Sequence, residues 1–154
     1  MLRIKQSHLY RLLDEALQSY PSECCGFLLG TKEGNVRRLL RCENEALNKL
    51  TNFLISANEY RQAEKKADEE GLCLLGVYHS HPDCAAKPSK YDCLAAFPNF
   101  SYLILSVSEK GATGPQCWKL NEQSCFEEEI IVIQKTYIKK NLTYGNYHYS
   151  YAPA

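Results

Sequence analysis

A strongly apolar run from Leu72 to Tyr78 leads directly into His79-Ser80-His81-Pro82. The run predicts a buried strand, and residues i and i+2 of an extended chain point to the same face. Both imidazoles can therefore reach one metal ion. Pro82 cannot donate to a strand ladder, so we expect the chain to leave the sheet there as a loop.

Ser89 and Asp92 extend this pattern into a candidate metal site. If Ser89 caps a short helix that reaches Phe97, Asp92 lies one turn in, close to the end of the strand. Two imidazoles and one carboxylate suit a catalytic zinc with a fourth position open for water. Each part is common by itself, because His-x-His arises by chance and Ser-x-x-Asp is usually a capping box. Their combination within one short stretch favours the metal site.

A zinc hydrolase also needs a carboxylate that takes a proton from the attacking water and passes it to the leaving group. Glu23 is the candidate, since it lies between Pro21, which stops a predicted helix, and the predicted strand from Cys25 to Gly30. The alternative is that Glu23 is a solvated turn residue.

The composition excludes several classes of protein. The chain has 154 residues, with 18 basic and 18 acidic side chains, so its charge gives no reason to expect nucleic acid or an anionic membrane as a partner. No apolar run approaches the roughly 20 residues that span a bilayer, and the N-terminus has no apolar core of a signal peptide. We therefore expect a cytoplasmic protein whose eight cysteines are reduced thiols.

Strands alternate with helices in the predicted order. A first helix is expected from a Ser7 cap to Tyr20, and a second from the capping box at Ser56 to Gly71. We expect residues 1–140 to form one domain. The Tyr-rich segment 141–154 is either a loose tail or a strand that pairs with another chain, and in the second case the protein could be a homodimer. The remaining predicted strands are Cys25–Gly30, Val36–Cys42, Thr51–Ile55, Tyr102–Val107, Cys117–Leu120 and Phe126–Ile133, with turns at Thr31–Gly34 and Lys110–Pro115.

The quoted residues resemble the signature of the JAMM (MPN+) metalloprotease family. That signature is a distant Glu, then His-Ser/Thr-His-Pro, then Ser-x-x-Asp. The resemblance covers roughly residues 1–133 and is greatest to small bacterial members of the CysO-cysteine peptidase type. It implies an α/β fold in which a curved mixed sheet is flanked by helices in a cytidine-deaminase-like three-layer α/β/α arrangement. The matching segments are Pro21-x-Glu23-x-Cys25-Gly26-x-Leu28-x-Gly30, His79-Ser80-His81-Pro82 and Pro88-Ser89-x-x-Asp92.

The resemblance also implies roles for the site residues. His79, His81 and Asp92 would bind Zn²⁺, Glu23 would be the general acid and base, and Ser89 would donate a hydrogen bond to the oxyanion. The substrate would be a ubiquitin-like sulfur carrier protein, with hydrolysis of the amide bond after its C-terminal Gly-Gly, for example to release cysteine. Glycines let such a tail approach the metal closely. Ser80, between the two ligands, should point away.

Two other functions remain open beside this interpretation. A deubiquitinase-like isopeptidase uses the same five residues, and a non-catalytic interaction module of this fold would lack stoichiometric zinc. A zinc deaminase is excluded because the chain has no Pro-Cys-x-x-Cys pair. A minority hypothesis places the Cys84 thiolate in the open zinc position, where it would hold the enzyme inactive.

Overall fold

The computed structural model describes residues 1–135. Six strands form one sheet in the order β3-β2-β4-β5-β6-β7, and β1 pairs with β8 in a separate two-stranded sheet. In the large sheet β4 and β5 are parallel and all other neighbours are antiparallel, so the sheet is mixed. In chain order the elements are β1 Leu2–Lys5, α1 Gln6–Ser19, β2 Cys25–Gly30, β3 Val36–Cys42, α2 Ala57–Glu69, β4 Cys73–Pro82, α3 Lys90–Ala95, β5 Ser101–Ser108, β6 Gly111–Leu120, β7 Phe126–Glu129 and β8 Ile131–Gln134.

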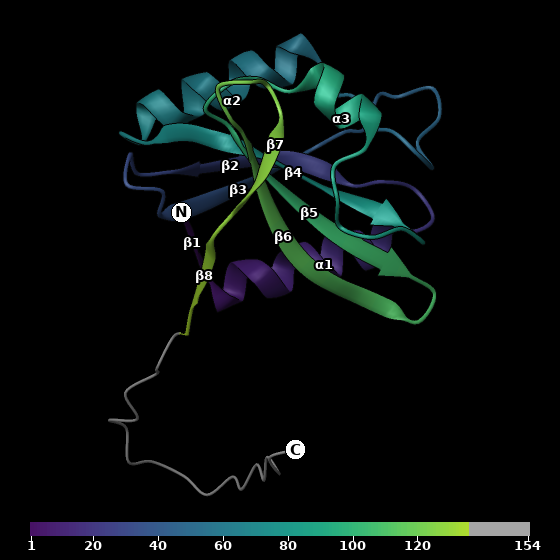
Figure 1. Cartoon of the computed structure of the whole chain (residues 1–154). Helices are drawn as coiled ribbons and strands as arrows, with labels where there is room; N and C mark the ends of the chain where they lie inside the picture. The colour runs from purple at the N-terminus through teal and green to yellow at the C-terminus, as the bar shows by residue number, and fades with distance from the viewer. Residues whose placement is uncertain (136–154) are drawn as a thin grey trace, which may run out of the picture.

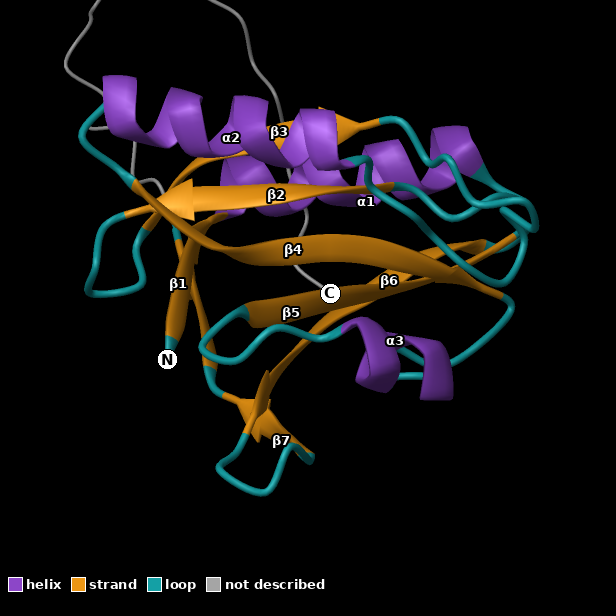
Figure 2. Cartoon of the chain, turned by 90° about the horizontal axis from the view of Figure 1, so that it is seen from above, coloured by secondary structure: helices purple, strands orange, loops and turns teal. Residues whose placement is uncertain are grey.

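Helices cover both faces of the large sheet (Figure 1). The α1 helix lies on one face, and α2 and α3 lie on the other, where they cover different strands (Figure 2). Side chains alternate across the strands, so neighbouring residues of β2 enter different cores: Leu28 packs toward α1, and Phe27 packs toward α2. The mixed sheet flanked by helices that the resemblance implied is confirmed.

The helix ends follow local sequence at α2 but not at α1. Ser56 Oγ accepts the Glu59 amide, and Gly71 follows the helix at φ +64°, as predicted. The α1 helix begins at Gln6, with Lys5 as an N-cap that makes no side-chain bond, so the predicted Ser7 cap is wrong. The reason is that β1, which was not predicted, runs directly into the helix.

Three predicted elements differ in the structure. Thr51–Ile55 is a loop, because the Asn44 side chain forms hydrogen bonds with the backbone of Asn52 and Leu54. Lys110–Pro115 is not a turn: only residues 109–110 turn, and β6 starts at Gly111. The predicted strand Phe126–Ile133 is two strands in two sheets, since β7 pairs with β6 and β8 pairs with β1.

Two further observations concern the chain as a whole. Among residues 1–135, no helix is long and apolar enough to cross a membrane. The eight cysteines all lie in this range and are free thiols. The predicted Tyr-rich tail, residues 141–154, falls outside the described residues, as does the predicted domain boundary at residue 140.

Candidate active site

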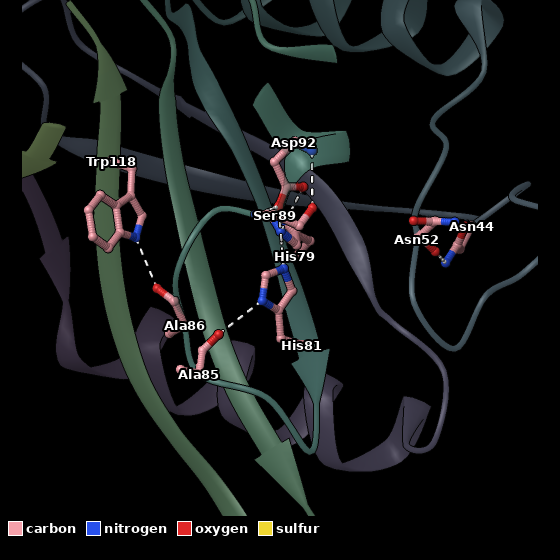
Figure 3. Close-up of polar contacts among 9 residues, drawn as sticks. All are labelled: Asn44, Asn52, His79, His81, Ala85, Ala86, Ser89, Asp92 and Trp118. Atoms are coloured by element: carbon pink, nitrogen blue, oxygen red, sulfur yellow. Dashed lines mark hydrogen bonds and ion pairs between the residues drawn. The ribbon is translucent and has the colours of Figure 1, made fainter. Parts of the chain in front are cut away.

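His79 and His81 lie within the C-terminal half of β4, between β2 and β5, rather than after the strand. They point to the same side of the sheet, as their spacing predicted (Figure 3). Both rings are buried, with exposed fractions of 0% and 7%. Ser80 points to the other face, where its Oγ accepts the Cys24 amide at 2.9 Å. The prediction that Ser80 points away from the metal ligands is therefore confirmed.

The loop after β4 folds back over the strand end and is fastened by hydrogen bonds. Trp118 Nε1 donates to the Ala86 carbonyl at 2.9 Å (Figure 3). Ser106 Oγ donates to the Cys84 carbonyl at 2.6 Å. The Ala85 carbonyl lies 3.0 Å from His81 Nδ1. A carbonyl only accepts, so Nδ1 of His81 holds the proton, which leaves the Nε2 lone pair for a metal.

The same loop delivers Asp92 through a helix cap. Ser89 is the N-cap of α3: the Asp92 amide donates to Ser89 Oγ at 3.2 Å, and the Ser89 amide donates to Asp92 Oδ2 at 2.6 Å. The predicted cap is confirmed, although α3 ends at Ala95 instead of Phe97. Because Ser89 Oγ accepts in this cap, its own O–H remains able to donate.

The three side chains meet at one point. His79 Nε2 lies 3.0 Å from His81 Nε2, and Asp92 lies 3.3 Å from His79 Nε2 through Oδ1 and 3.5 Å from His81 Nε2 through Oδ2. Tetrahedral zinc with bonds of about 2.0–2.1 Å places its ligand atoms about 3.3–3.4 Å apart. The donor set and its spacing therefore fit this ion. Within residues 1–135 no other group of three His, Cys, Asp or Glu side chains is arranged to hold a metal.

Cys84 is not part of this group. Its side chain is exposed, and only its backbone carbonyl is held, by Ser106. The structure therefore gives no support to the hypothesis that the Cys84 thiolate occupies the fourth zinc position.

The electrostatics suit a cation. Burial would raise the pKa of Asp92, but the neighbouring His79 and His81 rings outweigh it and hold the pKa well below its usual range. Burial lowers the pKa of His79, whose ring is fully enclosed. His79 Nδ1 has no hydrogen-bond partner among the described residues, so packing orients this ring: Phe53 stacks on it with centroids 4.4 Å apart.

Glu23 reaches the site through strand register. Cys25 of β2 pairs with His79 of β4, and the Ser80 amide donates to the Cys24 carbonyl at 3.1 Å. Extending this antiparallel pairing by one step places Glu23 opposite His81, so their side chains share a face. Glu23 is only 5% exposed, which contradicts the solvated-turn alternative. Burial raises the pKa of its carboxyl to about 7, His81 opposes the shift, and Asp92 adds to it.

Asn44 is a buried residue next to Glu23 that was not among the predicted site residues. Its side chain is buried, and both ends of its amide form hydrogen bonds. Nδ2 donates to the carbonyls of Glu23 at 3.1 Å and Asn52 at 3.0 Å. Oδ1 accepts hydrogen bonds from the backbone amides of Ala46 at 3.0 Å and Leu54 at 3.1 Å. Figure 3 shows its contact with Asn52. These bonds fasten the loop between β3 and α2, residues 43–56, to the backbone of Glu23. Its only sequence signal is its place between two predicted strands, in a segment that also contains Asn48.

Two cavities flank the loop of residues 43–56. The larger, of about 1090 Å³, is mostly apolar and extends from Asp92 and Ser89 toward α2 and the side chains of Leu47, Leu54 and Phe97. The smaller, of about 510 Å³, lies beside Glu23 at the end of α1. The larger cavity gives the site an apolar approach on the Ser89 side, whereas the smaller cavity is lined by none of the residues His79, His81, Ser89 and Asp92.

Comparison with known proteins identifies relatives along most of the chain. The family model of prokaryotic homologues of the JAB domain matches residues 5–121. A Pyrococcus furiosus protein named desampylase is 32% identical over 127 residues, which cover 82% of this chain and 87% of that protein. A Thermus thermophilus protein named "Probable TtuB-protein conjugate cleaving protease" is 35% identical over 91 residues, or 59% of this chain and 60% of that one.

Solved structures agree with the fold. A solution structure from Desulfitobacterium hafniense has a TM-score of 0.78 at 27% identity and covers 94% of this chain and 100% of its own. A JAB1/MPN domain protein from Archaeoglobus fulgidus has a TM-score of 0.55 at 20% identity, with coverage of 86% and 97%, and shows the shared fold alone. The length of the matches and the architecture lead to one assignment: the chain belongs to the prokaryotic JAB-domain branch of the JAMM/MPN+ family.

Proposed function

We propose that this protein is a zinc metallopeptidase that hydrolyses the amide bond after the C-terminal Gly-Gly of a ubiquitin-like protein. The observation that carries the proposal is the meeting of His79, His81 and Asp92, with donor atoms 3.0–3.5 Å apart, beside the buried carboxyl of Glu23. These three residues would hold Zn²⁺. When bound, the ion lowers the pKa of water to near 7 and polarises the scissile carbonyl.

The protein's own groups perform the remaining steps. The Glu23 carboxylate takes a proton from the attacking water and then donates it to the leaving amine, for which a pKa near 7 is suitable. The Ser89 hydroxyl donates to the oxyanion of the tetrahedral intermediate. The Phe53 ring covers His79, and Ala85 fixes the protonated nitrogen of His81. The large apolar cavity beside Ser89 and Asp92 accepts the extended tail of the substrate.

The specific substrate that we propose is a ubiquitin-like sulfur carrier protein, from which a single amino acid such as cysteine is released. The names of two relatives, a desampylase and a conjugate-cleaving protease, favour hydrolysis of conjugates between proteins as the second candidate. Both reactions need the same five residues, so they differ in the leaving group: a free amino acid or a lysine side chain. The cytoplasmic location and the homodimer stay predictions from the sequence.

The test uses the zinc-loaded protein with two substrates, a ubiquitin-like carrier extended by one cysteine and the same carrier joined to a lysine side chain. We expect His79→Ala and Glu23→Gln to abolish cleavage while circular dichroism shows an intact fold. Zinc should be stoichiometric in the wild type by metal analysis. A zinc-free wild-type protein, or undiminished cleavage by Glu23→Gln, would refute the proposal and favour an interaction module.

A further inference from the structure

The two histidines of the metal site are oriented by different means. The Ala85 carbonyl lies 3.0 Å from His81 Nδ1, whereas His79 Nδ1 is buried and has no hydrogen-bond partner within residues 1–135. A metal-bound histidine usually donates its second ring N–H to a carbonyl, a carboxylate or water. We infer that Phe53 is the positioning residue for His79, and that filling the larger cavity therefore strengthens zinc binding. The inference rests on the proposed function and adds a coupling between the metal and the substrate tail.

Phe53 lies between His79 and the larger cavity. Its ring stacks on the imidazole with centroids 4.4 Å apart and planes inclined by 26°. Phe53 lines the cavity, whereas His79 is fully buried and does not. Aromatic rings packed in this way attract each other beyond the burial of their surface area. The stack therefore holds the plane of the His79 ring, which a hydrogen bond holds in His81.

The larger cavity gives the Phe53 ring space to move. One face of the ring contacts His79, and the ring also borders a volume of about 1090 Å³. Rotation of the ring into this volume breaks the stack and frees His79. A substrate tail in the cavity occupies that space, so it favours the stacked position of Phe53. By linkage, the tail and zinc then each strengthen the binding of the other.

The loop that carries Phe53 also holds the general base. Two hydrogen bonds join residues 43–56 to the backbone of Glu23. The Lys49 carbonyl accepts the Glu23 amide at 2.7 Å, and Asn44 Nδ2 donates to the Glu23 carbonyl at 3.1 Å. The loop thus contacts a metal ligand, the base and the cavity, so an occupant of the cavity acts on both catalytic groups.

The first experiment measures the zinc dissociation constant of the folded full chain by competition with a chelator. Phe53→Ala should weaken zinc binding about 10- to 100-fold, the usual effect of losing a group that orients a metal-bound histidine. Phe53→Tyr keeps the ring and should stay within about twofold of the wild type. Phe100→Ala is the matched control and should not change zinc affinity. The Phe100 ring is also half-buried in the core beside α2, but it stacks on Tyr60.

Cobalt in place of zinc gives a spectroscopic signature of the same effect. The absorption bands of bound Co²⁺ depend on the arrangement of its ligands. The spectrum should change in Phe53→Ala and stay unchanged in Phe100→Ala. A merely structural role of Phe53 would lower the free energy of unfolding without changing the spectrum or the zinc affinity. Phe53→Leu, which removes less volume, gives the same test if circular dichroism shows that Phe53→Ala is unfolded.

The coupling is tested with a ubiquitin-like carrier truncated by its two C-terminal glycines, so that its tail fills the cavity but ends before the metal. At saturation this carrier should strengthen zinc binding by the wild type about fivefold and have no effect in Phe53→Ala. An unchanged zinc affinity in the wild type, or an equal effect in Phe53→Ala, overturns the inference. Equal zinc affinity of the wild type and Phe53→Ala also overturns it and leaves the proposed function standing. A wild type that binds no zinc refutes the proposed function itself.

Discussion

Glu23→Gln should stabilise the metal-free protein at alkaline pH while it removes activity. Burial raises the pKa of the Glu23 carboxyl from 4.5 to about 7. The Glu23 carboxyl therefore ionises at lower pH in the unfolded chain than in the folded chain. Its contribution to the free energy of unfolding is fully present below pH 4.5 and is lost as the pH rises through 7. A pKa difference of about 2.5, at about 1.36 kcal/mol for each pKa unit, corresponds to about 3 kcal/mol at pH 8. Glutamine has nearly the same shape and does not ionise, so the variant avoids this loss.

The assay is urea unfolding in the presence of a chelator, because a bound cation would favour the ionised carboxylate. The variant should be more stable than the wild type by about 3 kcal/mol at pH 8 and by about 1 kcal/mol at pH 5. Glu45→Gln is the control: this carboxylate is exposed on the neighbouring loop, and its removal should change stability by under about 0.5 kcal/mol at either pH. A Glu23→Gln variant that is no more stable than the wild type at pH 8, or whose advantage is independent of pH, refutes the reasoning.

Further predictions concern the metal ligands, the oxyanion donor and the loop. Ser89→Ala should lower kcat about 10²–10³-fold with zinc content retained, which stopped-assay kinetics and metal analysis would measure. The His81→Ala variant should purify without stoichiometric zinc. If it contained one zinc ion per chain, His81 would not be a zinc ligand. Asn44→Ala should cost about 2–4 kcal/mol of unfolding free energy and lower kcat, whereas Asn58→Ala, at an exposed position of α2, should change neither appreciably. Cys84→Ser should match the wild type in activity at all zinc concentrations, and a more active variant would revive the inhibitory thiolate.

Parts of the site were predictable because they depend on short spacings. His79 and His81 share a face because they are two residues apart in a strand, and Asp92 lies at the start of a helix because Ser89 caps it. The loop of residues 43–56 shows the opposite case. Its Thr51–Ile55 segment has strand-like composition, but the buried Asn44 side chain binds its backbone groups and Phe53 packs on His79, so no strand forms. Composition within a short window carries no information about such distant partners.

Short-range patterns along the chain set the chemistry of the site: two imidazoles, a carboxylate and a hydroxyl within one short stretch, each placed by the period of a strand or the cap of a helix. The complete fold sets what that chemistry can do. Glu23 is far from His81 along the chain, and only the antiparallel register of β2 and β4 places them opposite each other. Burial by the surrounding elements then raises the pKa of Glu23 to about 7. A register between distant strands and the burial it creates arise from the whole fold, so no local pattern specifies them.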